Sequence, residues 1–81
     1  SRALRAGAFD RAREVVTRMI WFAPRRAGLH FELGRIEVHA GCMNAAAAAF
    51  DACREMAASG GEMRIARMAE EALRRLRTRF N

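Results

Sequence analysis

Residues 27–58 read AGLHFELGRIEVHAGCMNAAAAAFDACREMAA, and this stretch decides the fold of the chain. Its order of glycine, small and large apolar residues occurs a second time, 34 residues earlier. The earlier stretch places Gly7, Phe9, Asp10, Ala12, Val16 and Met19 at the offsets of Gly41, Met43, Asn44, Ala46, Phe50 and Cys53. A pattern that returns at one fixed lag of this length indicates an internal structural repeat.

Both copies, and the segment that follows them, have the periodicity of α-helices. Apolar residues recur at spacings of three and four along these stretches, the last of which runs to about Phe80. Pro24 ends one helix, because proline cannot donate a backbone hydrogen bond and disfavours a helical predecessor. Gly41 ends the next helix, and by the repeat Gly7 is predicted to end a short helix over residues 1–6. The sequence therefore predicts an all-α chain of five helical segments.

Polar residues and one glycine give more local predictions. Asp10 and Asn44 are good N-cap residues and are predicted to begin their helices. Ser59 and Glu62 stand three apart, as in a capping box. Gly34 lies in the middle of a helix, where glycine costs about 1 kcal/mol relative to alanine. We expect the backbone of a neighbouring helix to approach closely at this glycine.

The 81 residues include 15 arginines and no lysine, against nine acidic residues, so the net charge is +6. This excess of basic residues raises the question of a nucleic-acid or acidic-membrane partner. Several acids precede an arginine by one helical turn, which favours ion pairs within helices. These pairs are Glu14 with Arg18, Glu70 with Arg74, and Glu71 with Arg75. No basic stripe with interleaved aromatic residues is apparent, so nucleic acid is not the expected partner.

The residues that carry site chemistry are few and scattered. Cys42 and Cys53 are separated by about 15 Å of helix, too far for a disulfide, which fits a reducing, cytoplasmic location. His39 and Cys42 stand three apart, but two ligands do not make a zinc site. No nucleophile has an orienting partner, so no catalytic residue, metal or cofactor is predicted. The sequence also lacks the run of about 18 apolar residues that a membrane span needs.

Four polar residues are interpreted as surface positions without a chemical role. Glu32, Glu37 and Asp51 are taken as solvated helix surface and not as a paired acid and base. His30 is likewise interpreted as a surface residue and not as a metal ligand.

These motifs resemble the tetratricopeptide repeat (TPR) family, whose unit of 34 residues carries a Leu-Gly pair, small and large apolar residues and a closing proline. The matches are Leu33-Gly34, Ala46 and Phe50 in one copy, and Ala12, Val16 and Pro24 in the other. The departures are His30 and Glu37 at the two aromatic positions and Ala58 at the proline position. The resemblance implies TPR-like antiparallel helix pairs, with a partial repeat at 1–24, a complete repeat at 25–58 and a capping helix at 59–81.

In this family the first helix of each pair lines a concave groove. Carried over to this sequence, the groove positions are Gly28, Phe31, Arg35, Val38, His39, Leu4 and Arg5. Phe31 and Val38 point away from the apolar seam of Leu29, Leu33 and Ile36. They are therefore either a binding patch or packing against the next helix. The lysine and asparagine set with which some members clamp a peptide carboxylate is absent here.

The resemblance implies a non-catalytic protein-protein interaction module or scaffold. The partner is an unknown protein, an upstream domain of the same chain, or a second copy. The periodicity predicts that Ile20 and Phe22 are buried. Trp21, which lies between them, is predicted to contact such a partner. The alternative is a helix end that is overpacked by a neighbouring loop. The chain opens on Ser1 in mid-pattern, so we expect it to belong to a longer protein.

A narrower resemblance is carried by three short stretches, RALRAG at 2–7, RMIWFAP at 18–24 and RLRTRFN at 75–81. They look like the C-terminal TPR tail of bacterial transglutaminase-like family proteins. That resemblance implies an accessory tail that shapes or covers the active cleft of an upstream papain-like domain.

Overall fold

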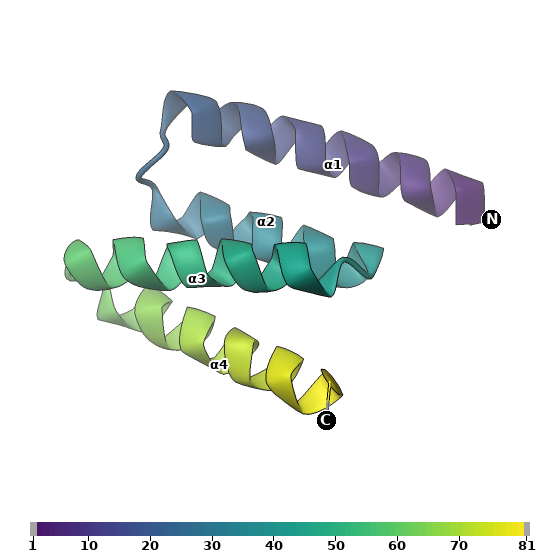
Figure 1. The fold of residues 1–81 in the computed structure, drawn as a ribbon. Coiled ribbons are helices and arrows are strands. Elements are labelled where there is room, and N and C mark those ends of the chain that lie inside the picture. The colour runs from purple at the N-terminus through teal and green to yellow at the C-terminus, as the bar shows by residue number, and fades with distance from the viewer. Residues whose placement is uncertain (1, 81) are drawn as a thin grey trace.

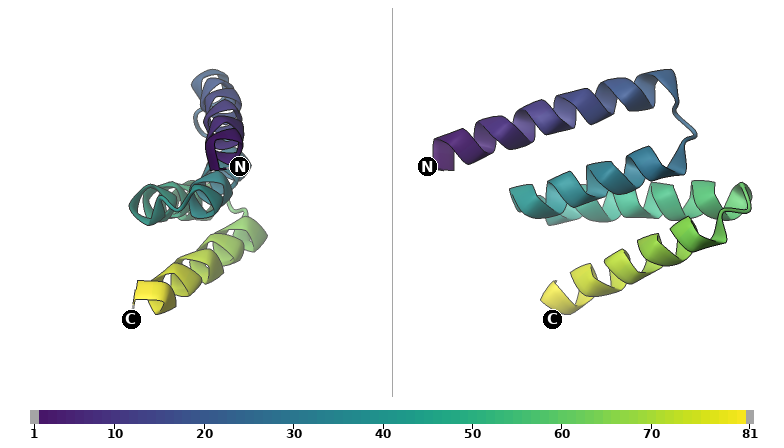
Figure 2. Two further views of the ribbon diagram at one scale, coloured as in Figure 1. Left: turned by 90° about the vertical axis from the view of Figure 1, so that its right-hand side faces the viewer. Right: turned by 180° about the vertical axis from the view of Figure 1, so that it is seen from behind.

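The computed structural model describes residues 2–80, with side chains described for residues 5–79. Within this range the chain forms four helices and no strand: α1 (Arg2–Phe22), α2 (Ala27–Ala40), α3 (Met43–Ser59) and α4 (Met63–Phe80). Successive helices run antiparallel, and α1 and α4 lie on opposite sides of the α2–α3 pair (Figure 1, Figure 2). The predicted all-α fold of antiparallel helix pairs is confirmed.

Helix α1 runs unbroken through Gly7 and Asp10, so the predicted helix end at Gly7 and the cap at Asp10 are wrong. Gly41, the counterpart of Gly7 in the repeat, has a left-handed φ of 81° and closes α2. Gly7 has no positive φ. The alanines on either side of it are strong helix formers, and they offset its cost of about 1 kcal/mol. The described chain therefore has four helices where the repeat predicted five segments.

The other helix ends agree with the sequence only in part. Helix α1 stops just before Pro24, as predicted. Asn44 lies inside the first turn of α3 and does not cap it. Ser59 is the last residue of α3 and Glu62 directly precedes α4, so the predicted capping box does not form. Gly61, with a φ of 75°, turns the chain between these two helices instead.

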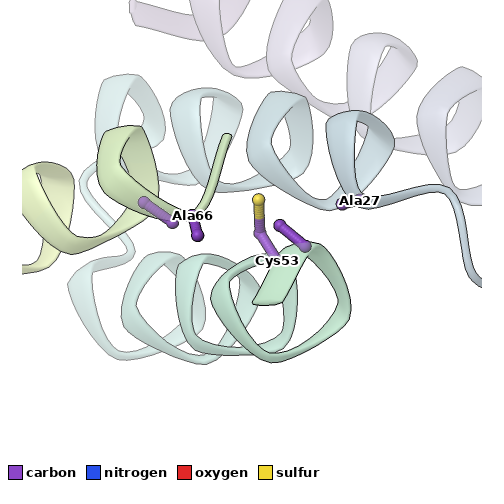
Figure 3. Close-up of a cluster of buried hydrophobic side chains, with 5 residues drawn as sticks. Ala27, Cys53 and Ala66 are labelled. Carbon is purple, nitrogen blue, oxygen red and sulfur yellow. The ribbon is translucent and has the colours of Figure 1, made fainter. Parts of the chain in front are cut away.

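The first buried cluster lies where α2, α3 and the beginning of α4 meet. Its members are Ala27, Cys53, Ala57, Ala66 and Ala69, of which Figure 3 labels three. Because alanine side chains are short, the three helices approach one another closely and leave little space between them. Burial raises the pKa of the Cys53 thiol, and both cysteines are free, as predicted.

The second buried cluster is built around Phe50 of α3, together with Ala46 and Leu76. A Cβ added to Gly34 would lie 2.5 Å from Cε1 of the Phe50 ring. The predicted close approach at Gly34 is present, but the neighbour is this ring and not a helix backbone. The Phe31 ring packs on the Phe50 ring in a tilted arrangement, with centroids 5.2 Å apart.

Helix α1 is attached differently, since among the described helices it contacts α2 alone. Glu37 of α2 is only 7% exposed, and its carboxylate accepts hydrogen bonds from Arg13 of α1. Nε donates to Oε2 at 3.0 Å and Nη2 to Oε1 at 2.7 Å. The interpretation of Glu37 as solvated surface is therefore wrong, because Arg13 neutralises it across the helix interface. This hydrogen bond is the main cause that raises the pKa of Arg13.

Four large apolar side chains of α1 are exposed. Val15, Met19, Trp21 and Phe22 are 57%, 46%, 82% and 84% exposed. The prediction that Phe22 is buried is wrong, because α2 is the one described helix that packs against α1 and it leaves Phe22 uncovered. Ile20 is half-buried.

Candidate functional site

A cleft of about 910 Å³ lies between α2 and α4 and is closed at its base by Phe50 of α3. We call it the α2–α4 cleft. Its apolar lining comes from all three helices and consists of Phe31, Val38, Phe50, Met68, Ala72 and Leu76. Its polar lining consists of Arg35, His39, Arg64, Arg67, Glu71, Arg75 and Arg79. The cleft therefore has an apolar base and a charged rim.

The lining follows from helical spacing. On α2, residues 31, 35 and 38 recur at intervals of four and three, so they project toward the same side of the helix. On α4, residues 64, 68, 71, 75 and 79 recur at the same intervals and face them across the cleft. The contacts of Leu76 with Ala46 and Phe50 hold the second half of α4 to α3.

Positive charge dominates the rim, which has five arginines and one glutamate. Arg35 is paired with Glu32 at 3.1 Å. Arg64 and Arg67 are exposed, and neither forms an ion pair with another described residue. Their guanidinium groups therefore keep their hydrogen-bond donors free for an outside ligand.

The single acid of the rim, Glu71, is held by its own helix. Arg74 hydrogen-bonds its carboxylate and is the main cause that lowers the pKa of Glu71. Arg75 lies 3.6 Å from the same carboxylate, as the sequence predicted. The pair predicted between Glu70 and Arg74 does not form, because Arg74 turns to Glu71 instead.

One further ion pair predicted within a helix is present. Glu14 and Arg18 of α1 are 3.1 Å apart, with both side chains more than half exposed. A pair this exposed is worth at most about 1 kcal/mol, so it adds little to the attachment of α1.

The residues predicted as groove positions separate into two places. Phe31, Arg35, Val38 and His39 line the α2–α4 cleft. Arg5 lines a smaller cavity of about 440 Å³ between α1 and the end of α2. Leu4 belongs to the backbone of α1, but its side chain lies outside the described residues. Because α1 lies on the opposite side of the α2–α3 pair from α4, its first turns do not line the cleft.

Two predicted residues stand apart from both cavities. Gly28 is half-buried near the start of α2 and lines neither of them. Trp21 is exposed on α1, outside both.

The alternatives for Phe31 and Val38 turn out to be compatible. Both side chains are half-buried and pack against the second buried cluster, and both line the cleft. They are therefore structural and surface residues at once.

The contribution of α4 to the rim was missed from the sequence. The resemblance predicts this helix only as a cap, and none of its arginines is among the predicted groove positions. The spacing of Arg64, Arg67, Arg75 and Arg79 along one side of the helix was the available signal.

Other candidate chemistry is sparse in the part of the chain that the structure describes. No group of three or more histidine, cysteine or acidic residues there is placed to hold a metal ion. His30 donates from Nε2 to the carbonyl oxygen of Pro24 at 2.9 Å, and Cys42 is exposed. No described helix has the length and apolarity to cross a membrane.

Comparison with known proteins gives one match. The curated proteins and the solved structures contain no match to this chain, and the narrower resemblance to transglutaminase-like proteins gains no support. A family model described as tetratricopeptide repeat matches residues 1–76. Together with the antiparallel helices, this match confirms the TPR-like fold. The chain belongs to the tetratricopeptide repeat family, whose helical repeats generally mediate protein-protein interaction without catalysis.

Proposed function

We propose that this chain is a non-catalytic protein-protein interaction module, and that its α2–α4 cleft holds a segment of the partner protein. The observation that carries the proposal is the cleft itself, which combines an apolar base with a rim of hydrogen-bond donors. Its volume of about 910 Å³ falls within the range of about 300–1,000 Å³ typical of binding pockets. A helical or extended peptide segment is the shape that such a groove between two helices accommodates.

The division of the chain fits this role. We take residues 1–24 as a partial repeat, residues 25–58 as a complete repeat, and residues 59–81 as the segment that holds the capping helix α4. The cleft then lies between the first helix of the complete repeat and the capping helix. The partner is a protein, and the module acts in the cytoplasm.

The chemistry of the lining favours protein recognition. Arginine and methionine are enriched in protein interfaces, and both project into the cleft from α4. Met68 is 45% exposed, so a partner that covers it removes apolar surface from water. Phe31 contributes a half-buried ring to the same cleft. Arg67 offers donors that a partner can satisfy.

The test is a selection of displayed random peptides on the 81-residue chain, followed by affinity measurements on the selected peptides. Met68→Ala removes an apolar contact from the cleft, and we expect the Kd to rise by about tenfold. Met19→Ala is a matched control, because Met19 lies on α1 and is 46% exposed against 45% for Met68. Circular dichroism checks that both variants remain helical.

The control decides the outcome. Peptides that respond to Met68→Ala and not to Met19→Ala support a binding site in the cleft. Peptides that respond only to Met19→Ala would place the binding surface on α1 and contradict the proposal. A selection that yields no peptide sensitive to Met68→Ala would contradict it as well.

A further inference from the structure

We infer that the α2–α4 cleft selects an acidic, amphipathic segment of its protein partner, with one or two large apolar side chains among several carboxylates. The inference rests on the proposed function and specifies the ligand of that site. It follows from the placement of charge around the cleft and from the aromatic residues at its base.

The first step is the imbalance of charge. Five arginines and one glutamate line the cleft, and that glutamate is already engaged by Arg74 and Arg75. Arg64 and Arg67, three residues apart on α4, form no ion pair with a described residue. A ligand with carboxylates finds free guanidinium donors here, whereas a basic ligand meets repulsion.

The second step is the apolar surface beside these charges. Met68 lies one position from Arg67 and lines the same cleft as Leu76 and Val38. An apolar side chain of the ligand that covers this surface excludes water and so strengthens the neighbouring ion pairs. Arginine suits this arrangement, because its planar guanidinium binds a carboxylate through two parallel hydrogen bonds.

The third step separates a peptide from a nucleic acid, which also offers anionic groups. Binding of single strands depends on aromatic rings that are free to stack on bases. The two phenylalanine rings at the base of the cleft are committed to each other, since Phe31 packs on Phe50 with centroids 5.2 Å apart. Phe50 is also only 2% exposed. The base of the cleft therefore favours aliphatic side chains over stacked bases.

The experiment measures fluorescence anisotropy of short labelled peptides on the 81-residue chain. One probe carries leucines at one-turn spacing and glutamate elsewhere; in a second probe every glutamate is glutamine, and in a third it is lysine. We expect the glutamate probe to bind at least about tenfold more tightly than the glutamine probe. The advantage should shrink as salt is added, because salt screens exposed charges.

Two variants locate the effect. Arg67→Glu reverses one charge in the cleft and should weaken the glutamate probe by about tenfold while improving the lysine probe. Arg11→Glu makes the same charge change at an exposed position on α1 and should leave both affinities within about twofold. An equal loss of affinity for the glutamate probe in the two variants would show that net charge alone attracts the probe, and would overturn the inference.

The remaining outcomes separate this inference from the proposed function. Equal binding of the glutamate and glutamine probes, with sensitivity to Met68→Ala, overturns the acidic preference and leaves the interaction module standing. Failure of all three probes overturns the inference, and the displayed peptides then test the proposed function independently. A single-stranded DNA that competes at the affinity of the glutamate probe, and that Arg67→Glu weakens, overturns it in favour of nucleic acid.

Discussion

Helix α2 is held in two different ways on its two sides. Toward α3 and α4 it presents Ala27, Gly34 and Phe31, and this side is closed by short side chains and a pair of rings packed in a tilted arrangement. Toward α1 it presents Glu37, whose carboxylate is bound by Arg13 across the interface. One side depends on shape and the other on a charged pair.

The difference teaches where a binding site can be maintained. Close packing of α2, α3 and α4 holds both walls of the cleft, because a small core residue cannot shift without opening a void. Among the described helices, α1 contacts α2 alone, and several of its large residues, such as Trp21 and Phe22, are exposed. The cleft is therefore on the side of α2 where geometry is best fixed.

The strongest way to break the packed side is Phe50→Ala. Phe50 is 2% exposed and fills the space above Gly34, so the variant should lose about 3–5 kcal/mol of unfolding free energy. Urea denaturation measures this loss. Val15→Ala on α1 is the control, since Val15 is 57% exposed, and it should change stability by no more than about 0.5 kcal/mol. Equal losses of unfolding free energy in the two variants would mean that the packed side of α2 and helix α1 do not differ in their contribution to stability.

The charged side is broken by Glu37→Ala, which leaves Arg13 without its main partner. We expect a loss of about 2–3 kcal/mol, less than for a fully buried pair because the Arg13 side chain is 31% exposed. Hydrogen exchange should accelerate in α1 and remain slow in α3. Glu32→Ala, which removes an exposed pair with Arg35, should cost at most about 1 kcal/mol. Uniform acceleration in both helices would show that α1 is not a separately attached element.

Glycine substitutions sharpen the comparison on α2 itself. Gly34→Ala places a Cβ 2.5 Å from the Phe50 ring, and overpacking of about 1–3 kcal/mol should outweigh the gain of about 1 kcal/mol in helix propensity. Gly28→Ala meets no atom within 4 Å, so it should stabilise the chain by up to about 1 kcal/mol. The midpoint temperature of thermal unfolding should therefore fall for Gly34→Ala and rise for Gly28→Ala. Stabilisation by both substitutions would mean that the contact at Gly34 is loose.

The smallest effect concerns Gly7, where the repeat and the structure disagree. Gly7→Ala lies inside α1 with no atom within 4 Å of the added Cβ, so it should stabilise the helix by about 0.5–1 kcal/mol. Gly41→Ala, at a φ of 81°, should destabilise by about 1 kcal/mol. Destabilisation by both substitutions would show that Gly7 needs the backbone conformation of a turn, as the repeat predicted.

The fold was predictable where local backbone chemistry decides the outcome. Helix α1 ends just before Pro24, because proline lacks a backbone N–H and disfavours a helical predecessor. Gly41 closes α2 in the left-handed conformation that glycine adopts at little cost. Gly7 shows the limit, because the same residue type at the same repeat offset remains helical. Glu37 shows another limit, since its burial depends on Arg13, which is 24 residues away in sequence.

Half of the candidate site could be predicted from the sequence. The α2 wall, including Phe31, Arg35 and Val38, follows from the repeat position of each residue. The α4 wall was missed, because helical spacing places its arginines on one side of the helix, but only the packing of α4 turns that side toward α2. Where α4 lies over the α2–α3 pair is a property of tertiary contacts, which periodicity alone does not contain.

The most direct test of the α2–α4 cleft as the binding surface is an NMR titration of the isotope-labelled chain with the glutamate probe. We predict that amide resonances around Arg35, Arg67 and Met68 shift together as the probe is added, and that the Trp21 indole resonance stays in place. Shifts centred on Trp21 and the outer side of α1, with the cleft residues unmoved, would contradict the assignment of the cleft as the binding site.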